Sequence, residues 1–472
     1  MQLVKSTTPK KIKTLYKLLL TILISFFAAF EPVSAQDNSP YSRYGIGDLV
    51  PPTNIISRGM GGVSAGYADL LSINFNNPAT YASFQSVKEA KSKKLSSGRA
   101  ILDLGLNFDT RTLREPANNN KFVANNALFS YVQVGVPLKQ GWGMSFGIRP
   151  VSRISYKIFR TEMLKDPLTG LPIDTATTVF NGDGGSYLAS MGTGFTVFRK
   201  EKHGLIEQLN VGFNAGYLFG EKDYSTKRYF INDTVSYNQA NYETKTNYGN
   251  LYFNAGLQYL LPLNKKLVLT IGAFGAWGQK MNATQDILRE TYLFSETSGE
   301  VRLDSVSDQR NIKGKIELPA SYTFGFTLQK LSVPNKEGGW IFGLDFAQQS
   351  WNNYRFYGIK DSVRNKWEVR VGAQINPIPK RNYLSNVSYR FGLFAGPDYI
   401  QVGRKLPQFG GSFGLGLPLA TSRQAPNQAT LINLAFEYSK RGNNDNLLKE
   451  NMFRVSVGFS VSDFWFIKRK YD

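Results

Sequence analysis

The sequence predicts an all-β protein: a transmembrane antiparallel β-barrel of about 14 strands with an N-terminal hatch in its lumen. The chain opens with an export signal, and no later run of about 18 apolar residues could form a membrane helix. From residue 100 onward, apolar and small polar side chains alternate with a period of two. Because only helices and closed barrels satisfy their backbone groups in a bilayer, an exported chain of this kind is a barrel or a secreted globule.

The first 35 residues form a three-part secretory signal. Five lysines precede an apolar run over residues 18–30, and Val33-Ser34-Ala35 follows as a small-residue cleavage site. The apolar run is short for a membrane span, so we expect residues 1–35 to be removed near Ala35. An uncleaved N-terminal anchor is the alternative.

Residues 36–99 differ in composition from the rest of the chain. They are rich in Gly, Asn, Ser and Pro, and they end in the polar stretch 88–98. Few of these residues alternate in the manner of a strand. We therefore expect a separately folded N-terminal element, followed by the barrel over residues 100–472.

The alternation is clearest in the last expected strand. Phe453, Val455 and Val457 face one way, whereas Arg454 and Ser456 face the other. In the other expected strands the second face is mainly Gly, Asn, Gln, Ser and Thr, with few charges. A solvent-exposed face carries more charge, so this composition favours a crowded polar lumen.

Fourteen strands can be placed, and an even number brings both ends of the barrel to the periplasmic side. Short periplasmic turns are expected at 138–140 and 263–266, and long external loops at 110–126, 164–183 and 291–312. The third, fifth and seventh strands exceed the membrane thickness, so they should project above the surface. The expected strands are 100–109, 127–138, 141–163, 184–198, 209–232, 245–261, 267–290, 313–330, 339–357, 364–376, 385–398, 408–418, 428–441 and 450–462.

Composition argues against enzymatic and cofactor chemistry. The chain has no cysteine and one histidine, His203, which sits in a charged turn. A thiol nucleophile, a Cys-ligated metal and nearly all His-based catalysis are therefore excluded, and we expect no cofactor and no metal. The net charge of +21 is scattered over turns and loops. It favours contact with anionic lipopolysaccharide over binding of nucleic acid.

The N-terminal element carries two motifs that resemble the start of the FadL-type family of outer-membrane channels for long-chain fatty acids and other hydrophobic compounds. The first is Arg58-Gly59-Met60-Gly61-Gly62-Val63, and the second is Asn76-Asn77-Pro78-Ala79. The ending, residues 463–472, resembles Bacteroidetes members of that family. The resemblance implies an outer-membrane location and a plug formed by residues 36–99, with Gly59, Gly61, Gly62, Asn76, Asn77, Pro78 and Ala79 as its hatch motif.

The same resemblance implies an inward kink in the third strand that opens the barrel wall sideways. Pro150 cannot donate to a strand ladder, and the nearby Gly147 leaves room to bend. Phe146 and Ile148 would lie near such an opening. These four residues are the lateral-gate candidates. Alternatively, Pro150 lies in a bulge or loop above the membrane.

Charged residues on the expected lumen side are candidates for holding the hatch, although most are expected to be structural pairs between strands. They are Asp103, Asp345, Glu368, Arg370, Arg390, Glu437 and Arg454.

The resemblance implies passive uptake of small hydrophobic, fatty-acid-like molecules, which would bind an apolar pocket beside the hatch and leave through the wall near Pro150. The alternative is an accessory barrel that docks to outer-membrane secretion or assembly machinery, as PorV does in type IX secretion. A barrel enzyme would need a base in the wall, and His203 is expected in a periplasmic turn instead. The expected partners are therefore outer-membrane lipid and lipopolysaccharide, a hydrophobic small molecule, or secretion machinery.

Overall fold

The computed structural model describes residues 39–88, 95–118, 120–231, 238–295, 299–333, 336–419 and 427–465. The predicted signal peptide and its cleavage site at Ala35 lie outside these residues. Among the described residues, no helix has the length and apolar character needed to cross a membrane.

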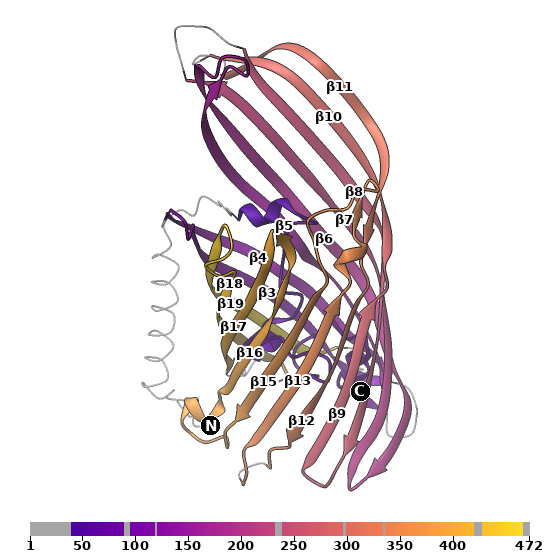
Figure 1. Cartoon of the computed structure of the whole chain (residues 1–472). Helices are drawn as coiled ribbons and strands as arrows, with labels where there is room; N and C mark the ends of the chain where they lie inside the picture. The colour runs from indigo at the N-terminus through magenta and orange to yellow at the C-terminus, as the bar shows by residue number, and fades with distance from the viewer. Residues whose placement is uncertain are drawn as a thin grey trace, which may run out of the picture.

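The chain forms a closed antiparallel barrel of 14 strands, as predicted (Figure 1). Each strand pairs with its neighbour along the chain, and β19 pairs with β3 to close the ring. Two of the 14 strands are interrupted once and carry two labels each, β9 with β10 and β11 with β12. The strands are β3 (Leu95–Arg114), β4 (Lys121–Lys139), β5 (Trp142–Lys165), β6 (Pro172–Lys202), β7 (Leu205–Phe230), β8 (Gln239–Pro262), β9 (Leu267–Ala276), β10 (Gln279–Ser295), β11 (Gly299–Leu318), β12 (Ser321–Lys330), β13 (Gly339–Gln349), β15 (Lys366–Asn376), β16 (Ser388–Val402), β17 (Arg404–Pro418), β18 (Ala429–Arg441) and β19 (Lys449–Trp465).

The two-residue alternation has the orientation that the sequence predicts. On β3, Leu102 and Leu106 are about 40% exposed on the outer face, whereas Asp103 and Asn107 are buried on the inner face. The apolar set of side chains therefore faces outward and the polar set inward, as in a barrel that sits in lipid.

The predicted long external loops are mostly strand. β3 and β4 are joined by the short segment 115–120, β5 continues to Lys165, and β10 and β11 extend to Ser295 and Gly299. The loop predictions at 110–126, 164–183 and 291–312 were therefore wrong. Continued pairing satisfies the backbone groups of these segments even beyond a membrane. We call the end that carries these hairpins the outer end, and the opposite end, where β19 finishes, the inner end.

The segment predicted as strand 339–357 ends earlier than expected. β13 stops at Gln349, and the chain then forms the 3-10 turn η3 (Trp351–Asn353) and the two-residue β14 (Arg355–Phe356). β14 pairs with the last residues of β11, Ile316 and Glu317, near the junction with β12. This connection covers the outer end of the lumen, a tertiary role that a period-two pattern does not reveal.

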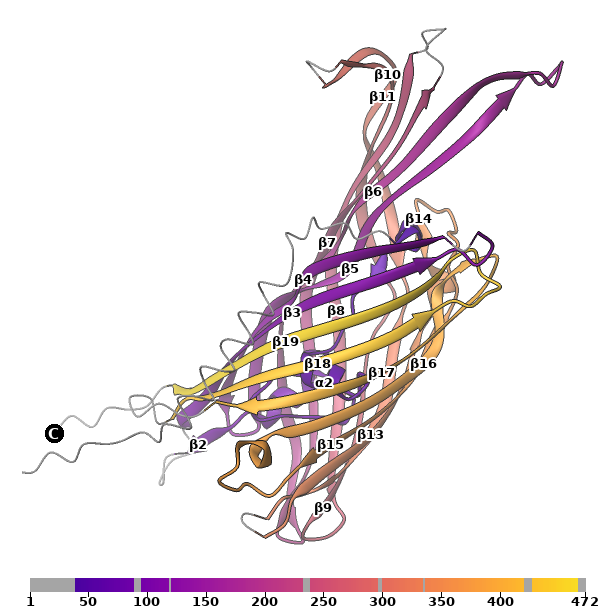
Figure 2. The same cartoon turned by 90° about the vertical axis from the view of Figure 1, so that its left-hand side faces the viewer.

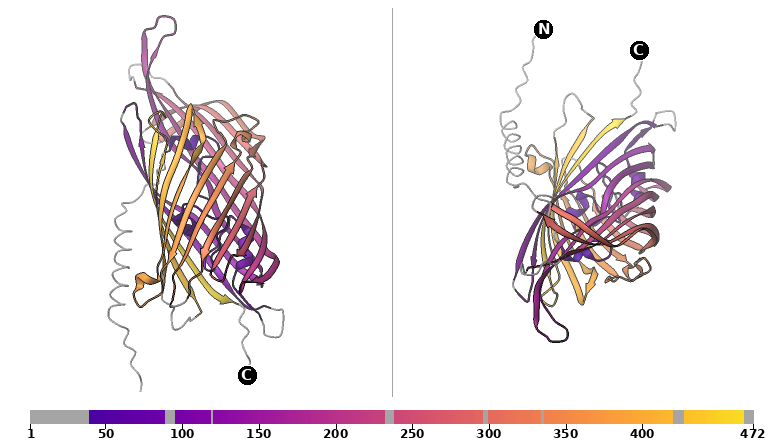
Figure 3. Two further views of the ribbon diagram at one scale, coloured as in Figure 1. Left: turned by 60° about the horizontal axis from the view of Figure 1, so that its bottom comes forward. Right: turned by 90° about the horizontal axis from the view of Figure 1, so that it is seen from above.

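The N-terminal segment, residues 39–88, contains η1 (Pro40–Arg43), β1 (Asp48–Leu49), α2 (Ile55–Gly59), η2 (Pro78–Ser83) and β2 (Ser86–Lys88). Most of its residues are buried, and in the view from above it lies within the ring of strands (Figure 3). The barrel strands begin at Leu95, slightly before the predicted boundary.

Glycines on the inner face of the wall bring the strands into contact with the backbone of this segment. A Cβ atom on any of them would overlap a backbone atom of the segment, or the Asn77 side chain in the case of Gly256. They lie on seven of the 14 strands, so the barrel wall is shaped to the N-terminal segment around half of its circumference. These glycines are Gly143, Gly194, Gly212, Gly256, Gly272, Gly372 and Gly392.

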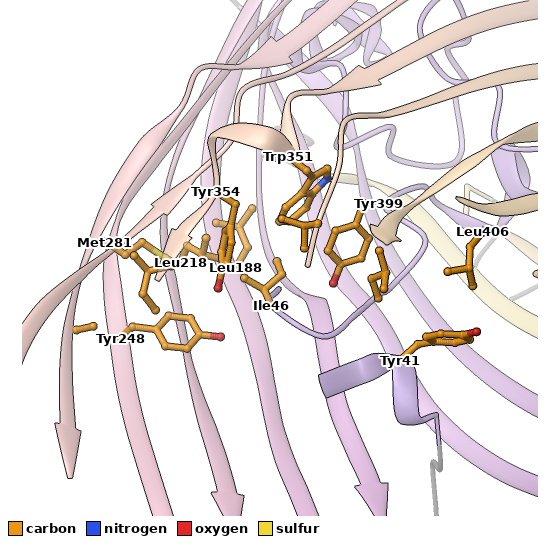
Figure 4. Close-up of a cluster of buried hydrophobic side chains, with 14 residues drawn as sticks. Tyr41, Ile46, Leu188, Leu218, Tyr248, Met281, Trp351, Tyr354, Tyr399 and Leu406 are labelled. Atoms are coloured by element: carbon orange, nitrogen blue, oxygen red, sulfur yellow. The ribbon is translucent and has the colours of Figure 1, made fainter. Parts of the chain in front are cut away.

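An apolar cluster fills the outer end of the lumen (Figure 4). It joins Tyr41 and Ile46 of the N-terminal segment to inward side chains of the barrel and to Trp351 and Tyr354 of the β13–β15 connection. The rings of Trp351 and Tyr399 lie 4.4 Å apart. Polar contacts add to this packing, since Tyr354 donates a hydrogen bond of 3.1 Å to the carbonyl of Gly45.

Candidate functional site: a gap in the barrel wall

The wall is incomplete between β4 and β5. These strands pair only from Lys139–Trp142 at the inner end to Val132–Ile148. Above that point, residues 121–131 of β4 pair only with β3, and residues 149–165 of β5 pair with β6 and, at two residues, with β1. Figure 2 shows β3 and β4 running away from β5 and β6 toward the outer end.

Two bulges and a proline mark the point where the strands part. Ser130 is the extra residue of a bulge in β4, and Val151 is the extra residue of a bulge in β5. A bulge bends its strand and increases the local twist. Pro150, beside the second bulge, has no N–H to donate across the gap. These features explain why the two strands separate here.

A cavity of about 1010 Å³ occupies the gap. Its apolar rim comes from β4, β5, β6 and β7, with Leu128, Phe129 and Pro150 on one side and Tyr187 and Phe219 on the other. The rings of Tyr187 and Phe219 stack at 6.0 Å. The lining also includes the charged residues Arg153, Asp183 and Glu221.

The four lateral-gate candidates surround the lower border of this gap. Pro150 lines the cavity itself. Phe146, Gly147 and Ile148 lie in the last stretch where β4 and β5 are paired. They line an apolar depression of about 460 Å³. Phe146 is 45% exposed there. These residues thus lie where the β4–β5 pairing ends, and their role as a lateral gate stays a prediction.

The N-terminal segment covers part of the free edge of β5. β1 pairs antiparallel with it, Asp48 with Arg153 and Leu49 with Ser152. The amide of Val50 donates a 3.0 Å hydrogen bond to the carbonyl of Val151. Val50, the residue after β1, lines both the gap cavity and a smaller cavity in the lumen. The chain at β1 therefore lies between the two cavities.

Asp48 anchors β1 to the opposite wall. Its carboxylate accepts a 2.5 Å contact from Arg111 of β3 and a 2.8 Å contact from Arg441 of β18. Glu450 bridges the same two arginines at 3.4 and 3.2 Å, and Asp398 also pairs with Arg441. Burial raises the pKa of Asp48, but the two guanidinium groups outweigh burial and lower the pKa to about 2.

This depressed pKa predicts an acid-sensitive attachment of β1. Because the folded pKa lies below the ordinary value of 3.8, the stabilisation is complete above about pH 4 and is lost as the pH falls toward 2. We expect pepsin to cleave residues 39–50 increasingly fast over that interval. In the Asp48→Asn variant, the cleavage rate should not show this increase between pH 4 and pH 2, because no carboxylate is protonated at position 48. Identical pH profiles for the two proteins would contradict the prediction.

The lumen cavity, of about 280 Å³, is lined by both charged and apolar side chains. The apolar pocket beside the hatch stays a prediction. Most of the lining charges are paired with one another, because an isolated charge in such a space is costly. The charged residues that line it are Asp48, Arg58, Arg111, Arg149, Lys366, Glu368, Arg370, Asp398, Glu437, Arg441, Glu450 and Arg454.

Three of the seven predicted lumen charges form hydrogen bonds with the backbone of the N-terminal segment. Asp345 accepts hydrogen bonds from the amides of Ser64 and Ala65 at 2.7 and 2.9 Å. Asp103 accepts one from the amide of Ile73 at 3.0 Å. Arg370 donates to the carbonyl of Gly62 at 3.4 Å.

The other four predicted lumen charges contact barrel residues. Glu368 pairs with Arg370 at 2.6 Å, and Glu437 lies 3.7 Å from Arg454. Arg390 donates to Gln374 of the neighbouring strand at 2.8 Å and also hydrogen-bonds the side chain of Tyr67 in the N-terminal segment. The pairs of Glu368 and Glu437 tie barrel strands together.

The glycine residues of the hatch motif shape a turn in the segment. Gly59 ends α2, and Gly61 and Gly62 follow with φ of 66° and 91°. Such values strain any residue with a Cβ atom. The amide of Gly61 also donates to Ser412 of β17 at 2.9 Å.

The Asn-Asn-Pro-Ala residues bind the segment to itself and to the wall. The Asn77 side chain donates to the carbonyls of Ala65 and Leu257, and its oxygen accepts from the amide of Ala79 at the start of η2. Pro78 is the first residue of η2. The carbonyl of Asn76 accepts from Asn254 of β8 at 3.1 Å.

Sequence reasoning missed the ion-paired group of Asp48, Arg111 and Arg441. Arg111 lies on the same face of β3 as Asp103, so the alternation could have suggested its inward direction. Asp48 belongs to a segment without periodicity, and no sequence signal shows which strands it will face.

The described residues contain no group of three or more His, Cys, Asp and Glu side chains that could hold a metal ion. His203 lies in the tight β6–β7 turn at the inner end, with φ of 54°. His203 therefore lies at the opposite end of the strands from the gap between β4 and β5.

A family model described as BamG matches residues 12–472, almost the whole chain. The chain belongs to the BamG family. Among solved structures, a Pseudomonas aeruginosa FadL homologue is similar at 12% identity, with 89% of this chain and 100% of that chain covered and a TM-score of 0.50. The P. putida toluene transporter TodX aligns at 13% identity, with 88% and 99% covered and a TM-score of 0.45. The CymD monoaromatic hydrocarbon channel aligns at 13% identity, with 88% and 98% covered and a TM-score of 0.47. No curated protein matches the sequence.

The BamG-family chain thus has the fold of FadL-type outer-membrane barrels. This agrees with the outer-membrane barrel that the sequence predicted.

Proposed function

We propose that this protein lets small hydrophobic molecules move passively between the cell exterior and the outer-membrane bilayer through the gap between β4 and β5. The observation that carries the proposal is the end of β4–β5 pairing at Val132–Ile148, with a cavity of about 1010 Å³ at the break. The outer end of the barrel then faces the exterior, and the exported chain resides in the outer membrane among lipid and lipopolysaccharide.

The proposed route avoids the lumen. The lumen cavity is lined by charged side chains and covered by the apolar cluster at the outer end, whereas the gap cavity offers Leu128, Phe129 and Pro150. A hydrophobic molecule therefore enters the gap cavity from outside and moves past Phe146 and Ile148 into lipid. The movement follows the concentration gradient, because transfer of apolar surface from water into hydrocarbon is favourable.

The FadL homologue with the same fold supports an uptake role for a barrel of this architecture. The charged lumen favours small molecules that the gap cavity can hold whole. Each methylene group of a ligand that stays in water instead of the cavity lowers the favourable binding free energy by roughly 0.8 kcal/mol.

Filling the gap cavity tests the proposal. Ala127 lines the cavity, and Ala127→Trp is expected to reduce uptake of a fluorescent hydrophobic probe into proteoliposomes at least fivefold, because the indole occupies the route. The matched control is Ala255→Trp on β8, whose neighbours along the strand, Phe253 and Leu257, belong to the predicted lipid-facing set. Equal uptake by both variants and by liposomes without protein would refute transport through the gap.

The second candidate is an accessory barrel that docks to outer-membrane secretion or assembly machinery. It is favoured by a lumen that the N-terminal segment fills and by hairpins that project far past the barrel, since β6 alone has 31 residues whereas a membrane strand needs about 10. The protein extracted gently from native membranes should then migrate as a complex much larger than 52.9 kDa plus its detergent. Migration as a lone barrel under several mild detergents would count against docking.

A further inference from the structure

The lining of the lumen cavity carries more positive than negative side chains. Seven arginine and lysine residues line it, against five aspartate and glutamate residues. Each of the five carboxylates forms an ion pair with one or more of five cations, and none of these pairs includes Arg58 or Arg149. Two guanidinium groups of the cavity therefore have no carboxylate partner within the part of the chain that the structure describes. The five paired cations are Arg111, Lys366, Arg370, Arg441 and Arg454.

Arg58, near the end of α2, is a buried cation with neutral partners. Its side chain is 3% exposed, and its Nε has no hydrogen-bond partner among the described residues. A buried N–H without an acceptor and a buried charge without a counter-charge are both costly. Arg58 thus lacks one acceptor and one negative charge. Its terminal nitrogens donate to Asn107 at 2.6 Å, to the carbonyl of Pro51 at 2.9 Å, to Ser130 at 3.1 Å and to Ser456 at 3.4 Å.

Arg149 of β5 lines the same cavity without a polar partner. Its guanidinium carbon lies 5.5 Å from the centre of the Phe75 ring. No hydrogen bond or ion pair joins Arg149 to another described residue. The N–H donors of this guanidinium group are therefore available to a ligand in the cavity.

The two arginines lie near one another, where β4 and β5 part. Arg58 donates to Ser130, the extra residue of the bulge in β4. Two residues further along β4, Val132 pairs with Ile148, the neighbour of Arg149 on β5. Both side chains are thus held beside the last β4–β5 pair, on the lumen side of the wall. Like charges repel one another, so an anion between these two arginines would stabilise both.

We propose that this part of the lumen cavity binds a phosphate group through Arg58 and Arg149. Guanidinium groups bind phosphate through charge-assisted N–H···O hydrogen bonds. A phosphate group carries roughly two negative charges near neutral pH, so one group balances both arginines, whereas a carboxylate balances one. The cavity, of about 280 Å³, has room for such a group. The phosphate is either free phosphate or the headgroup of a lipid that reaches in from the wall gap.

This inference goes beyond the proposed transport function. The site lies in the lumen cavity, which the chain at β1 separates from the gap cavity, and it needs no hydrophobic molecule to pass through the wall. Arg58 belongs to the N-terminal segment and Arg149 to the wall, so a bound phosphate would join the two beside the place where β4–β5 pairing ends.

Thermal unfolding of the full mature protein in dodecyl maltoside, a phosphate-free detergent, tests the site with inorganic phosphate as the probe. Sodium chloride keeps the ionic strength constant. Phosphate is expected to raise the unfolding midpoint along a saturable curve, because a ligand that binds only the folded state stabilises it. Arg149→Gln should weaken the apparent affinity by about tenfold or more. In chloride alone this variant should unfold at the wild-type midpoint or above it, because the substitution removes an unpaired charge.

The matched control is Arg160→Gln on the same strand. Arg160 pairs with Glu162 at 2.8 Å and does not line the cavity, so this variant should keep the wild-type phosphate curve. A second arm replaces inorganic phosphate with lipopolysaccharide, either intact or dephosphorylated, in the same detergent.

A rise in the midpoint that depends on phosphate and on Arg149 supports the proposal. Seen with inorganic phosphate, it identifies free phosphate as the source, and seen only with intact lipopolysaccharide, it identifies a lipid headgroup. The proposal is overturned if neither arm gives a rise that Arg149→Gln weakens, or if sodium acetate at the same concentration gives an equal rise.

Discussion

Replacing Gly392 with valine is expected to prevent the N-terminal segment from seating in the lumen and to destabilise the barrel by about 3 kcal/mol, the upper end of the usual cost of overpacking. A Cβ atom on Gly392 would overlap the backbone amide of Gly61. Backbone on both sides of the contact leaves little room to relax, because each belongs to a structure fixed by other hydrogen bonds. Thermal unfolding monitored by circular dichroism should show a lower midpoint for Gly392→Val.

The matched control is Gly411→Val on the neighbouring strand β17. A Cβ atom there meets the Leu393 side chain at 3.3 Å and the carbonyl oxygen of Gly392 at 3.6 Å, an ordinary van der Waals distance. Valine also suits a strand better than glycine does. This variant should therefore unfold at or near the wild-type midpoint. A similar loss in both variants would mean that glycine matters for the strands themselves rather than for the N-terminal segment.

Replacing Asp48 with alanine is expected to release β1 from the wall gap. The substitution removes the anion that Arg111 and Arg441 share at 2.5 and 2.8 Å. Breaking a buried ion pair by removing one partner costs about 3–5 kcal/mol. Glu450 and Asp398 still pair with the two arginines, so we expect the lower end of this range. The local opening of β1 should become easier by a corresponding factor, at least tenfold.

Cysteine labelling measures this opening without background, because the chain has no cysteine. In a Leu49→Cys protein, the added Asp48→Ala change should accelerate maleimide labelling at least tenfold. Asp304→Ala is the control, because Asp304 lies on the exposed strand β11. Its side chain accepts a hydrogen bond from the neighbouring amide of Ser305. Unchanged labelling in Asp48→Ala would show that backbone pairing with β5 alone holds β1.

The alternation of side chains predicted the number of strands and the direction of each face correctly, because a barrel wall imposes the same two-sided environment on every residue pair. Strand ends were less predictable. Residues 110–126 and 164–183 have no strong alternation, yet hairpin pairing extends through them. A strand beyond the membrane has no need for an apolar outer face, so it can carry charged residues such as Lys157, Arg160 and Glu162. The alternation of apolar and polar residues therefore does not reveal such strand extensions.

Parts of the candidate site were accessible from sequence for a similar reason. Pro150 marks a place where a strand cannot pair on one side, which is a local property of proline. The bulge residues Ser130 and Val151 carry no such mark, since bulges depend on how two strands align. The charged side chains of the lumen cavity come from several strands and converge only after the barrel closes, so the sequence gives no signal of their grouping.

The sequence by itself determined the barrel and the orientation of its two faces, since these follow from local periodicity. Only the tertiary structure decided that Asp48 meets Arg111 and Arg441, that glycines on seven strands contact the N-terminal segment, and that β4–β5 pairing ends at Val132–Ile148. These features join residues up to several hundred positions apart. Their energies depend on which side chains a closed ring brings within a few ångströms, which no local pattern records.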